Sequence, residues 1–207
     1  MNKPELKNLS QEMEDKILFS ATRIFVRKGK AGTSMQDIAD EAGINRTLLN
    51  YYFRSKENLF EQVFIKIFSR FLPVIVSTLQ SEIHILKRLE SFIDYYFTIL
   101  IENPIIPVFI LQELSTNPQR IVSLLKEGGI NISPFLVALE SEMEKGTIRK
   151  MDPKEIMVNL MSLIIFPFAA RRIFEEIIFK GDIKSYTEFI YQRNKNLKSS
   201  FIESLKP

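Results

Sequence analysis

Apolar residues recur with a helical period over the first sixty residues of the chain. From about Ser10 to Lys28 they fall three, four or seven residues apart, and Gly29 follows a basic last turn, which is typical of a helix end. A second helical pattern runs from Ser34 to Glu41. Its predicted apolar stripe consists of Met35, Ile38, Ala39 and Ala42. The spacing predicts two amphipathic helices joined by a short turn.

A third helical pattern begins after Gly43, a residue that can adopt the positive φ at which a helix ends. Asn45 is a favourable N-cap for this helix, and its inward side is predicted to carry Leu48 or Leu49, Tyr52 and Phe53. Its outward side carries hydrogen-bond donors and no acid: Asn45, Arg46, Thr47, Asn50 and Tyr51. Two helices joined at a small residue, the second with such a face, form a helix-turn-helix pattern, here over residues 34–53.

The remainder of the chain also predicts helices, so the expected fold class is all-α. Ser55 caps a long fourth helix that Pro73 bends or ends. No glycine occurs between Ile44 and Glu127, and the chain has no Asn-Gly or Asp-Gly hairpin turn. Residues 1–9 are expected to be a frayed polar leader. Further helices are expected near 82–102, 104–116, 118–127, 134–145, 153–179 and 184–205.

The helix that opens at Asp152-Pro153 is apolar on nearly every side from Ile156 to Ala170. Such a helix must be covered all round, either by its own domain or by a second copy of the chain. A four-helix seam of residues 153–179 and 184–205 from two subunits meets this need, and so does burial in a large monomer. The run of about fifteen residues is shorter than the roughly 20 that cross a membrane, so no membrane partner is expected.

Composition excludes several kinds of chemistry. The chain has no cysteine, which excludes disulfides, cysteine–zinc sites and a cysteine nucleophile and fits a reducing cytoplasm. Its first sixteen residues are mostly polar, so no signal peptide is expected in them. His84 is the single histidine, too little for a metal site or a Ser-His-Asp arrangement. We therefore expect neither enzyme activity nor a cofactor or metal.

Positive charge gathers around the helix-turn-helix pattern. The whole chain has a net charge of only +3, whereas eight bases and three acids between residues 16 and 56 give that segment +5. A basic surface around such a motif is the electrostatic footprint expected on nucleic acid, although a solvated basic face has the same composition.

Four sequence features agree at once over residues 10–60. They are a phenylalanine before a lysine-glycine pair, then T-S-x-x-D-I-A, then A-G-I, and then Y-Y-F-x-S-K. Together they resemble the N-terminal domain of TetR-family transcriptional regulators. Thr47, Leu48 and Asn50 depart from the residues that this family often has, which bears on the bases that are read.

The resemblance implies a DNA-binding domain at 10–60 and a larger helical ligand-binding and dimerisation domain at 61–207. It implies a ligand-released repressor that binds a palindromic double-stranded operator as a homodimer, with recognition helices about 34–36 Å apart. The alternative is a helical adaptor whose helix-turn-helix binds a protein partner. The salt dependence of DNA binding distinguishes the two hypotheses. The affinity of a DNA-binding regulator for DNA falls steeply as the salt concentration rises.

The predicted contacts follow from the chemistry of the major groove. Arg46 can pair with guanine, Asn45 or Asn50 with adenine, and Thr47 offers a hydroxyl and a methyl. Tyr51 and Tyr52 suit phosphate, and Tyr52 equally suits the core. Lys56 lies at the start of a helix, where a positive charge opposes the helix dipole. A bound phosphate would explain a lysine at this position, because helix N-termini bind anions. The resemblance implies the same contact of Lys56 with a backbone phosphate. Thr33 and Ser34, either of which can cap the second helix, are weaker phosphate candidates.

Aromatic residues and methionines of the second part form either a plain core or, as the resemblance implies, a cavity for a small and largely apolar effector. The candidate pocket residues are Phe92, Tyr95, Tyr96, Phe109, Met157, Asn159, Met161 and Phe166. The operator and the effector itself cannot be read from the sequence.

Overall fold

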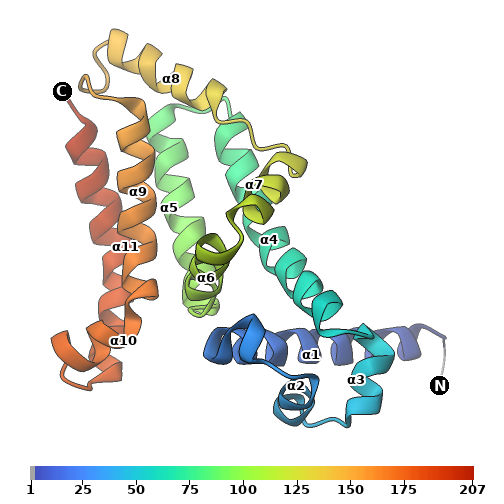
Figure 1. Cartoon of the computed structure of the whole chain (residues 1–207). Helices are drawn as coiled ribbons and strands as arrows, with labels where there is room; N and C mark the ends of the chain where they lie inside the picture. The colour runs from blue at the N-terminus through green and yellow to red at the C-terminus, as the bar shows by residue number, and fades with distance from the viewer. Residues whose placement is uncertain (1–2) are drawn as a thin grey trace. The chain divides into compact units, whose positions relative to one another are not determined.

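The computed structural model describes residues 3–207, with side chains from Asn8 onward, and within those residues it contains helices and no strand (Figure 1). The all-α fold class is confirmed. The chain divides into two compact units: residues 1–69 with 108–116, and residues 70–107 with 117–207. The first unit thus extends nine residues beyond the expected limit of residue 60 and takes in a distant helical segment.

The first unit starts with α1 (Lys3–Gly32), which is kinked at Gly29, where φ is 70°. The predicted helix end at Gly29 coincides with this kink, after which one more helical turn follows. The prediction of a frayed leader is wrong for residues 3–9, which are helical. Residues 1–2 lie outside the described part of the chain. The next elements are α2 (Met35–Ala42), α3 (Arg46–Phe53) and α4 (Lys56–Gln80).

The core of this unit joins all of these helices. Ile17, Ala21 and Ile24 of α1 are fully buried, as their helical period predicts. Residues 108–116 of α6 (Ile106–Thr116) belong here because the ring of Phe109 packs 5.4 Å from that of Phe60 and 5.3 Å from that of Phe64. Pro73 does not end α4, which continues to Gln80.

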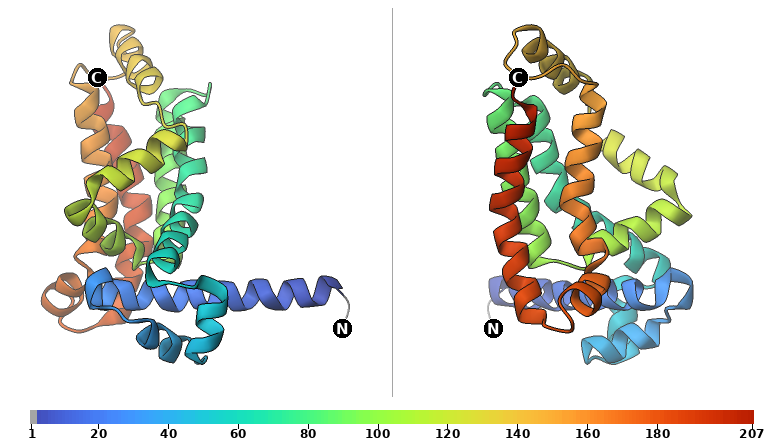
Figure 2. Two further views of the ribbon diagram at one scale, coloured as in Figure 1. Left: turned by 45° about the vertical axis from the view of Figure 1, so that its right-hand side comes forward. Right: turned by 90° about the vertical axis from the view of Figure 1, so that its left-hand side faces the viewer.

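The second unit contains the last turns of α4 and the remaining helices. In Figure 2, α11 runs along α5, and α9 contacts both. The helices of this unit are α5 (Ile85–Glu102), α7 (Pro118–Glu127), α8 (Ser133–Glu144), α9 (Pro153–Ala169), α10 (Arg171–Ile173), the π-helix η1 (Phe174–Ile178) and α11 (Ile183–Leu205).

The helix predicted at 153–179 is wrong in its extent, because α9 ends at Ala169 and is followed by α10 and η1. Pro167 has no N–H group and leaves the carbonyl of Leu163, four residues earlier, without its helical donor. Arg193 of α11 donates its Nη2 to that carbonyl at 3.1 Å. The tyrosine hydroxyl of Tyr186 donates to the carbonyl of Pro167 at 3.1 Å. The end of α9 is thus fixed by bonds from α11.

Within the described residues, no single helix is both long and apolar enough to cross a membrane. Two helix pairs reach that length and composition only when joined across a sharp bend, α5 with α6 at 97° and α9 with residues 171–178 at 62°.

Candidate nucleic-acid interface

Local capping positions the two helices of the motif. Ser34, rather than Thr33, caps α2 in a reciprocal capping box with Asp37. Gly43 ends α2 in the left-handed conformation, at φ 63° and ψ 38°. Asn45 then caps α3, with its Oδ1 accepting a 2.7 Å hydrogen bond from the N–H of Leu48. The chain therefore turns between α2 and α3 at one glycine and one side-chain cap.

The third helix has one buried and one exposed face. Leu49 and Phe53 are buried and Leu48 is half-buried, which settles the sequence alternative in favour of Leu49. The exposed side chains are those of Asn45, Arg46, Thr47, Asn50 and Tyr51. This face presents donors and no acid to the solvent, and its helical form suits a major groove.

The two asparagines of this face differ in what they can offer. The carbonyl oxygen of Asn45 is engaged in the cap. Asn50 is exposed, and no hydrogen bond of its side chain is described in residues 8–207. A bidentate contact with adenine needs both the oxygen and the nitrogen of the amide. Asn50 is therefore the better placed of the two as an adenine reader.

The adjacent tyrosines also differ. Tyr51 is 79% exposed. Tyr52 is half-buried, its hydroxyl lies 3.5 Å from that of Ser10 in α1, and its ring packs edge-on to Tyr51 at 5.5 Å. Tyr51 is free to reach a phosphate, whereas Tyr52 links α3 to α1.

Lys56 joins the start of α4 to the start of α2. Its Nζ donates a 2.9 Å hydrogen bond to the carbonyl of Thr33 and retains further protons for an anion. The hydroxyl of Thr33 is buried and donates to the carbonyl of Gly29 at 2.7 Å. The structure therefore does not offer the Thr33 hydroxyl to a phosphate.

Ser34 is equally engaged. Its hydroxyl donates to Asp37 Oδ2 at 2.7 Å, and Lys28 Nζ lies 2.6 Å from Asp37 Oδ1. Hydrogen bonds from Lys28 and Ser34 hold the pKa of Asp37 far below its ordinary value of 3.8. An ionised carboxylate thus occupies the N-terminus of α2, where a phosphate was expected.

Ion pairs divide the basic cluster into two parts. Arg23 and Arg27 lie 3.2 and 3.5 Å from Glu41 of α2, as Lys28 lies near Asp37. Arg46 and Arg54 are exposed, with no ion pair described in residues 8–207. Three bases of α1 thus pair with Glu41 and Asp37 of α2, whereas Arg46 and Arg54 leave exposed positive charge at both ends of α3.

Arg54 and Lys16 are two further candidate contacts that the sequence analysis did not single out. Arg54 follows α3 with φ at 53°, a conformation that non-glycine residues seldom adopt and that often marks functional sites. Lys16 Nζ lies beside the turn at Gly43. Both belong to the basic cluster of residues 16–56, and this membership is the sequence feature by which they could have been identified.

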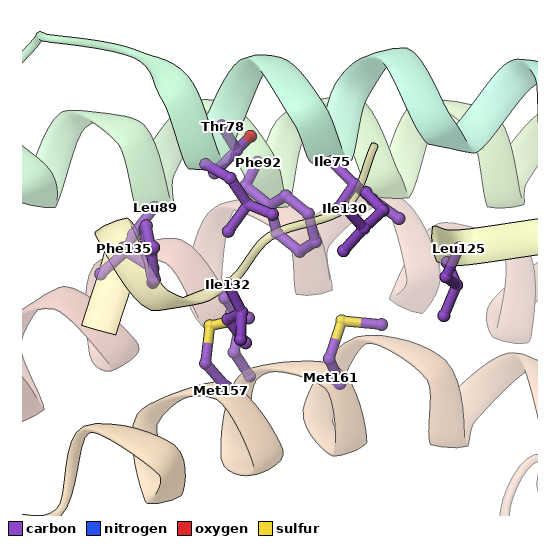
Figure 3. Close-up of a pocket in the computed structure, with 12 residues that line it drawn as sticks. Ile75, Thr78, Leu89, Phe92, Leu125, Ile130, Ile132, Phe135, Met157 and Met161 are labelled. Atoms are coloured by element: carbon purple, nitrogen blue, oxygen red, sulfur yellow. The ribbon is translucent and has the colours of Figure 1, made fainter. Parts of the chain in front are cut away.

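The second unit contains an apolar cavity of about 170 Å³ (Figure 3). In Figure 3, Met157 and Met161 of α9 lie opposite Phe92 and Ile75 across it. These two methionines and Phe92 are the three expected pocket residues that line it. Among the described lining side chains, none is charged and one, that of Thr78, has a hydroxyl. The other lining residues are Leu79, Leu89, Leu125, Ile130, Ile132, Phe135 and Leu160.

Five expected pocket residues lie elsewhere. Tyr95 and Phe166 are 60% and 61% exposed, and Asn159 is exposed. Tyr96 is buried between Phe92 and Phe71, and this burial raises the pKa of its hydroxyl. Phe109 packs in the core of the first unit.

His84 has a structural role. Its Nδ1 accepts a 3.4 Å hydrogen bond from the N–H of Leu86 at the start of α5, and its Nε2 lies 3.5 Å from Glu142. Among the described residues, no group of three or more metal-ligating side chains comes together.

Comparison with known proteins agrees with this geometry. Residues 17–63 match the model of the family described as bacterial regulatory proteins, tetR family. The probable HTH-type transcriptional regulator YttP of Bacillus subtilis (strain 168) is 25% identical over 186 residues, which are 86% of this chain and 87% of YttP.

Two further similarities are informative. The biofilm operon icaADBC HTH-type negative transcriptional regulator IcaR of Staphylococcus aureus (strain Newman) is 30% identical over 108 residues, 52% of this chain and 56% of IcaR. The crystal structure of HlyIIR, a hemolysin II transcriptional regulator, shares the fold with a TM-score of 0.64 and 24% identity, over 95% of this chain and 98% of that chain.

The capped helix pair and its exposed donor face define a DNA-binding helix-turn-helix protein. With the match over residues 17–63 and the similarity to these relatives, the chain is a helix-turn-helix transcriptional regulator whose N-terminal part is similar to that of the tetR family.

Proposed function

We propose that this regulator is a repressor that binds a palindromic operator as a homodimer and is released by a small apolar effector. The observation that carries the proposal is the face of α3, on which five donor side chains are exposed and no acid is present. Arg46 is the principal base reader on this face, with Asn50 and Thr47 beside it, and Tyr51, Lys56 and Arg54 contact the DNA backbone. Repression is supported by the similarity to IcaR, a negative regulator by name.

Dimerisation is supported by the exposed side of α9. Val158, Leu163 and Phe166 are 60%, 39% and 61% exposed, although this helix was expected to be covered all round. They are separated by five and three residues, so they fall on one broad face of α9, and Arg193 places α11 beside it. A second copy related by a two-fold axis covers this face with its own α9 and α11.

The effector class follows from the cavity between α4, α5 and α9. An apolar cavity of roughly 150 Å³ is large enough for benzene. The cavity here is of that size, about 170 Å³, and its surface is apolar. An ionised ligand would lose its hydration without gaining a partner, so the effector is neutral and apolar.

The test is the affinity of Arg46→Ala for operator DNA obtained by selection from a random duplex pool. Loss of a bidentate guanine contact costs about 1–3 kcal/mol, so the dissociation constant should rise by about 5- to 150-fold. Arg172→Ala, which removes an exposed arginine from the second unit, is the matched control and should bind like the wild type. Equal affinities of Arg46→Ala and wild type would remove Arg46 from the interface.

A further inference from the structure

A second cavity lies within the first unit, bounded by the end of α1, the start of α4 and α6. We name it the α1–α6 cleft. Its volume is about 680 Å³, within the roughly 300–1,000 Å³ of small-molecule sites. It shares no lining residue with the apolar cavity of the second unit. Its position and size set it apart as a separate candidate site.

The inner wall of the α1–α6 cleft is aromatic and rigid. Phe25, Phe60 and Phe109 contribute to it, and each is at most 3% exposed. The rings of Phe25 and Phe60 meet edge-on at 4.9 Å, and those of Phe60 and Phe109 lie 5.4 Å apart. Rings packed in this way keep their positions without a ligand, so the base of the cleft is preformed.

Two ammonium groups stand at this wall. Lys30 is exposed, and its Nζ lies 4.6 Å from the ring centroid of Phe60. Lys56 Nζ bonds to the carbonyl of Thr33 and keeps two further protons. Lys30 therefore already provides the cation that packs on Phe60, and both lysines can still pair with an anion.

The acids of the cleft are less available to a ligand. Glu113 is 6% exposed and already engaged with other residues. Glu57 lies in the first turn of α4, where the helix dipole stabilises a carboxylate. A cationic ligand would have to displace Lys30 from Phe60, whereas an anionic one gains two ammonium partners.

We propose that the α1–α6 cleft binds a small aromatic anion, with its apolar part in the cleft beside the Lys30 side chain and its acidic group paired with Lys30 and Lys56. Mixed sites of this kind, an apolar wall with a few convergent polar groups, are typical of ligand pockets. The regulatory consequence rests on the proposed function. Lys56 is also the expected phosphate contact, so an anion in the cleft competes with DNA for the same ammonium.

The experiment uses 1-anilinonaphthalene-8-sulfonate, a fluorescent aromatic anion, as the probe on the full-length protein. Saturable fluorescence enhancement with one site per chain is expected. Lys30→Gln should weaken binding about tenfold, because a charge-assisted contact is lost, and Lys126→Gln, an exposed lysine of α7, should leave it unchanged. Ser115→Trp, at an exposed position of the cleft rim, should abolish binding by filling the space.

Absence of saturable binding would overturn the proposal, as would wild-type binding by both Lys30→Gln and Ser115→Trp. The DNA readout is separate. Saturating probe should weaken operator binding by the wild type several-fold and leave that of Ser115→Trp unchanged. If the probe binds in the cleft and operator affinity stays constant, the competition through Lys56 is wrong. If the protein binds no DNA, the proposed function fails, while the fluorescence titration still decides the cleft.

Discussion

Asn45 combines two tasks at the start of α3. Its carbonyl oxygen caps the helix, and its amide nitrogen faces the solvent side that is proposed to meet DNA. Asn45→Ala should lower the free energy of unfolding by about 1 kcal/mol, the usual cost of a lost cap, as measured by urea titration.

Asn45→Asp separates the two tasks, because aspartate keeps the cap but adds a negative charge next to the DNA backbone. It should keep wild-type stability and bind operator DNA more weakly. Wild-type DNA affinity of Asn45→Asp would place residue 45 away from the DNA.

Asp37 links stability to pH through the capping box. Its pKa is depressed in the folded protein by Lys28 and Ser34, so the carboxylate stabilises the fold above its ordinary pKa of 3.8 and this contribution is lost as the pH falls below that value. Urea unfolding should show a stability difference between wild type and Asp37→Asn that is constant from pH 7 to 5 and shrinks below about pH 4. A difference that is unchanged at pH 3 contradicts the assignment.

The starts of α2, α3 and α9 were well predicted because they depend on local signals. Ser34, Asn45 and Asp152 cap their helices through bonds to residues two or three positions later, which a single sequence displays. The end of α9 was not predicted, because the apolar run continues past Ala169 and the bonds that fix the end come from Tyr186 and Arg193 on α11. Contacts across such distances leave no periodic pattern.

For the same reason, only three of the eight expected pocket residues line the apolar cavity of the second unit. An aromatic cluster in the sequence does not reveal which rings face each other, so Phe109 was grouped with Phe92 although it packs on Phe60 in the other unit. Likewise, the exposed donors of α3 follow from helical period, whereas the engagement of Thr33 and Lys56 with backbone carbonyls requires the folded chain.

The cavity between α4, α5 and α9 yields a prediction at this scale. Toluene, a small neutral probe, should raise the unfolding temperature of the wild type in proportion to its occupancy. Met161→Trp fills the cavity and should remove that rise, whereas Met151→Trp, at a position that does not line the cavity, should retain it. The same toluene shift in Met161→Trp as in wild type would show that the probe binds elsewhere.

At the scale of the whole molecule, the proposed two-fold assembly links the exposed face of α9 to DNA binding. Glutamate in place of both Val158 and Phe166 puts two charges on the exposed apolar face of α9 and should give monomers by sedimentation velocity. Operator affinity should fall by roughly 100-fold, because two linked recognition helices bind far more tightly than one.

Val137→Glu is the control for this change, because Val137 is 61% exposed on α8 and outside the proposed seam. It should remain dimeric. If the variant with glutamate at both Val158 and Phe166 remained dimeric, the dimer interface would lie elsewhere.

The central claim is that the exposed face of α3 reads duplex DNA. It is tested most directly by the salt dependence of wild-type binding to duplexes selected from a random pool, measured by fluorescence anisotropy. The selected sequences should be palindromic, and the logarithm of the association constant should fall linearly with the logarithm of salt concentration. Failure to enrich any sequence, or an affinity that is weak and independent of salt, would contradict it and favour a protein partner for this face.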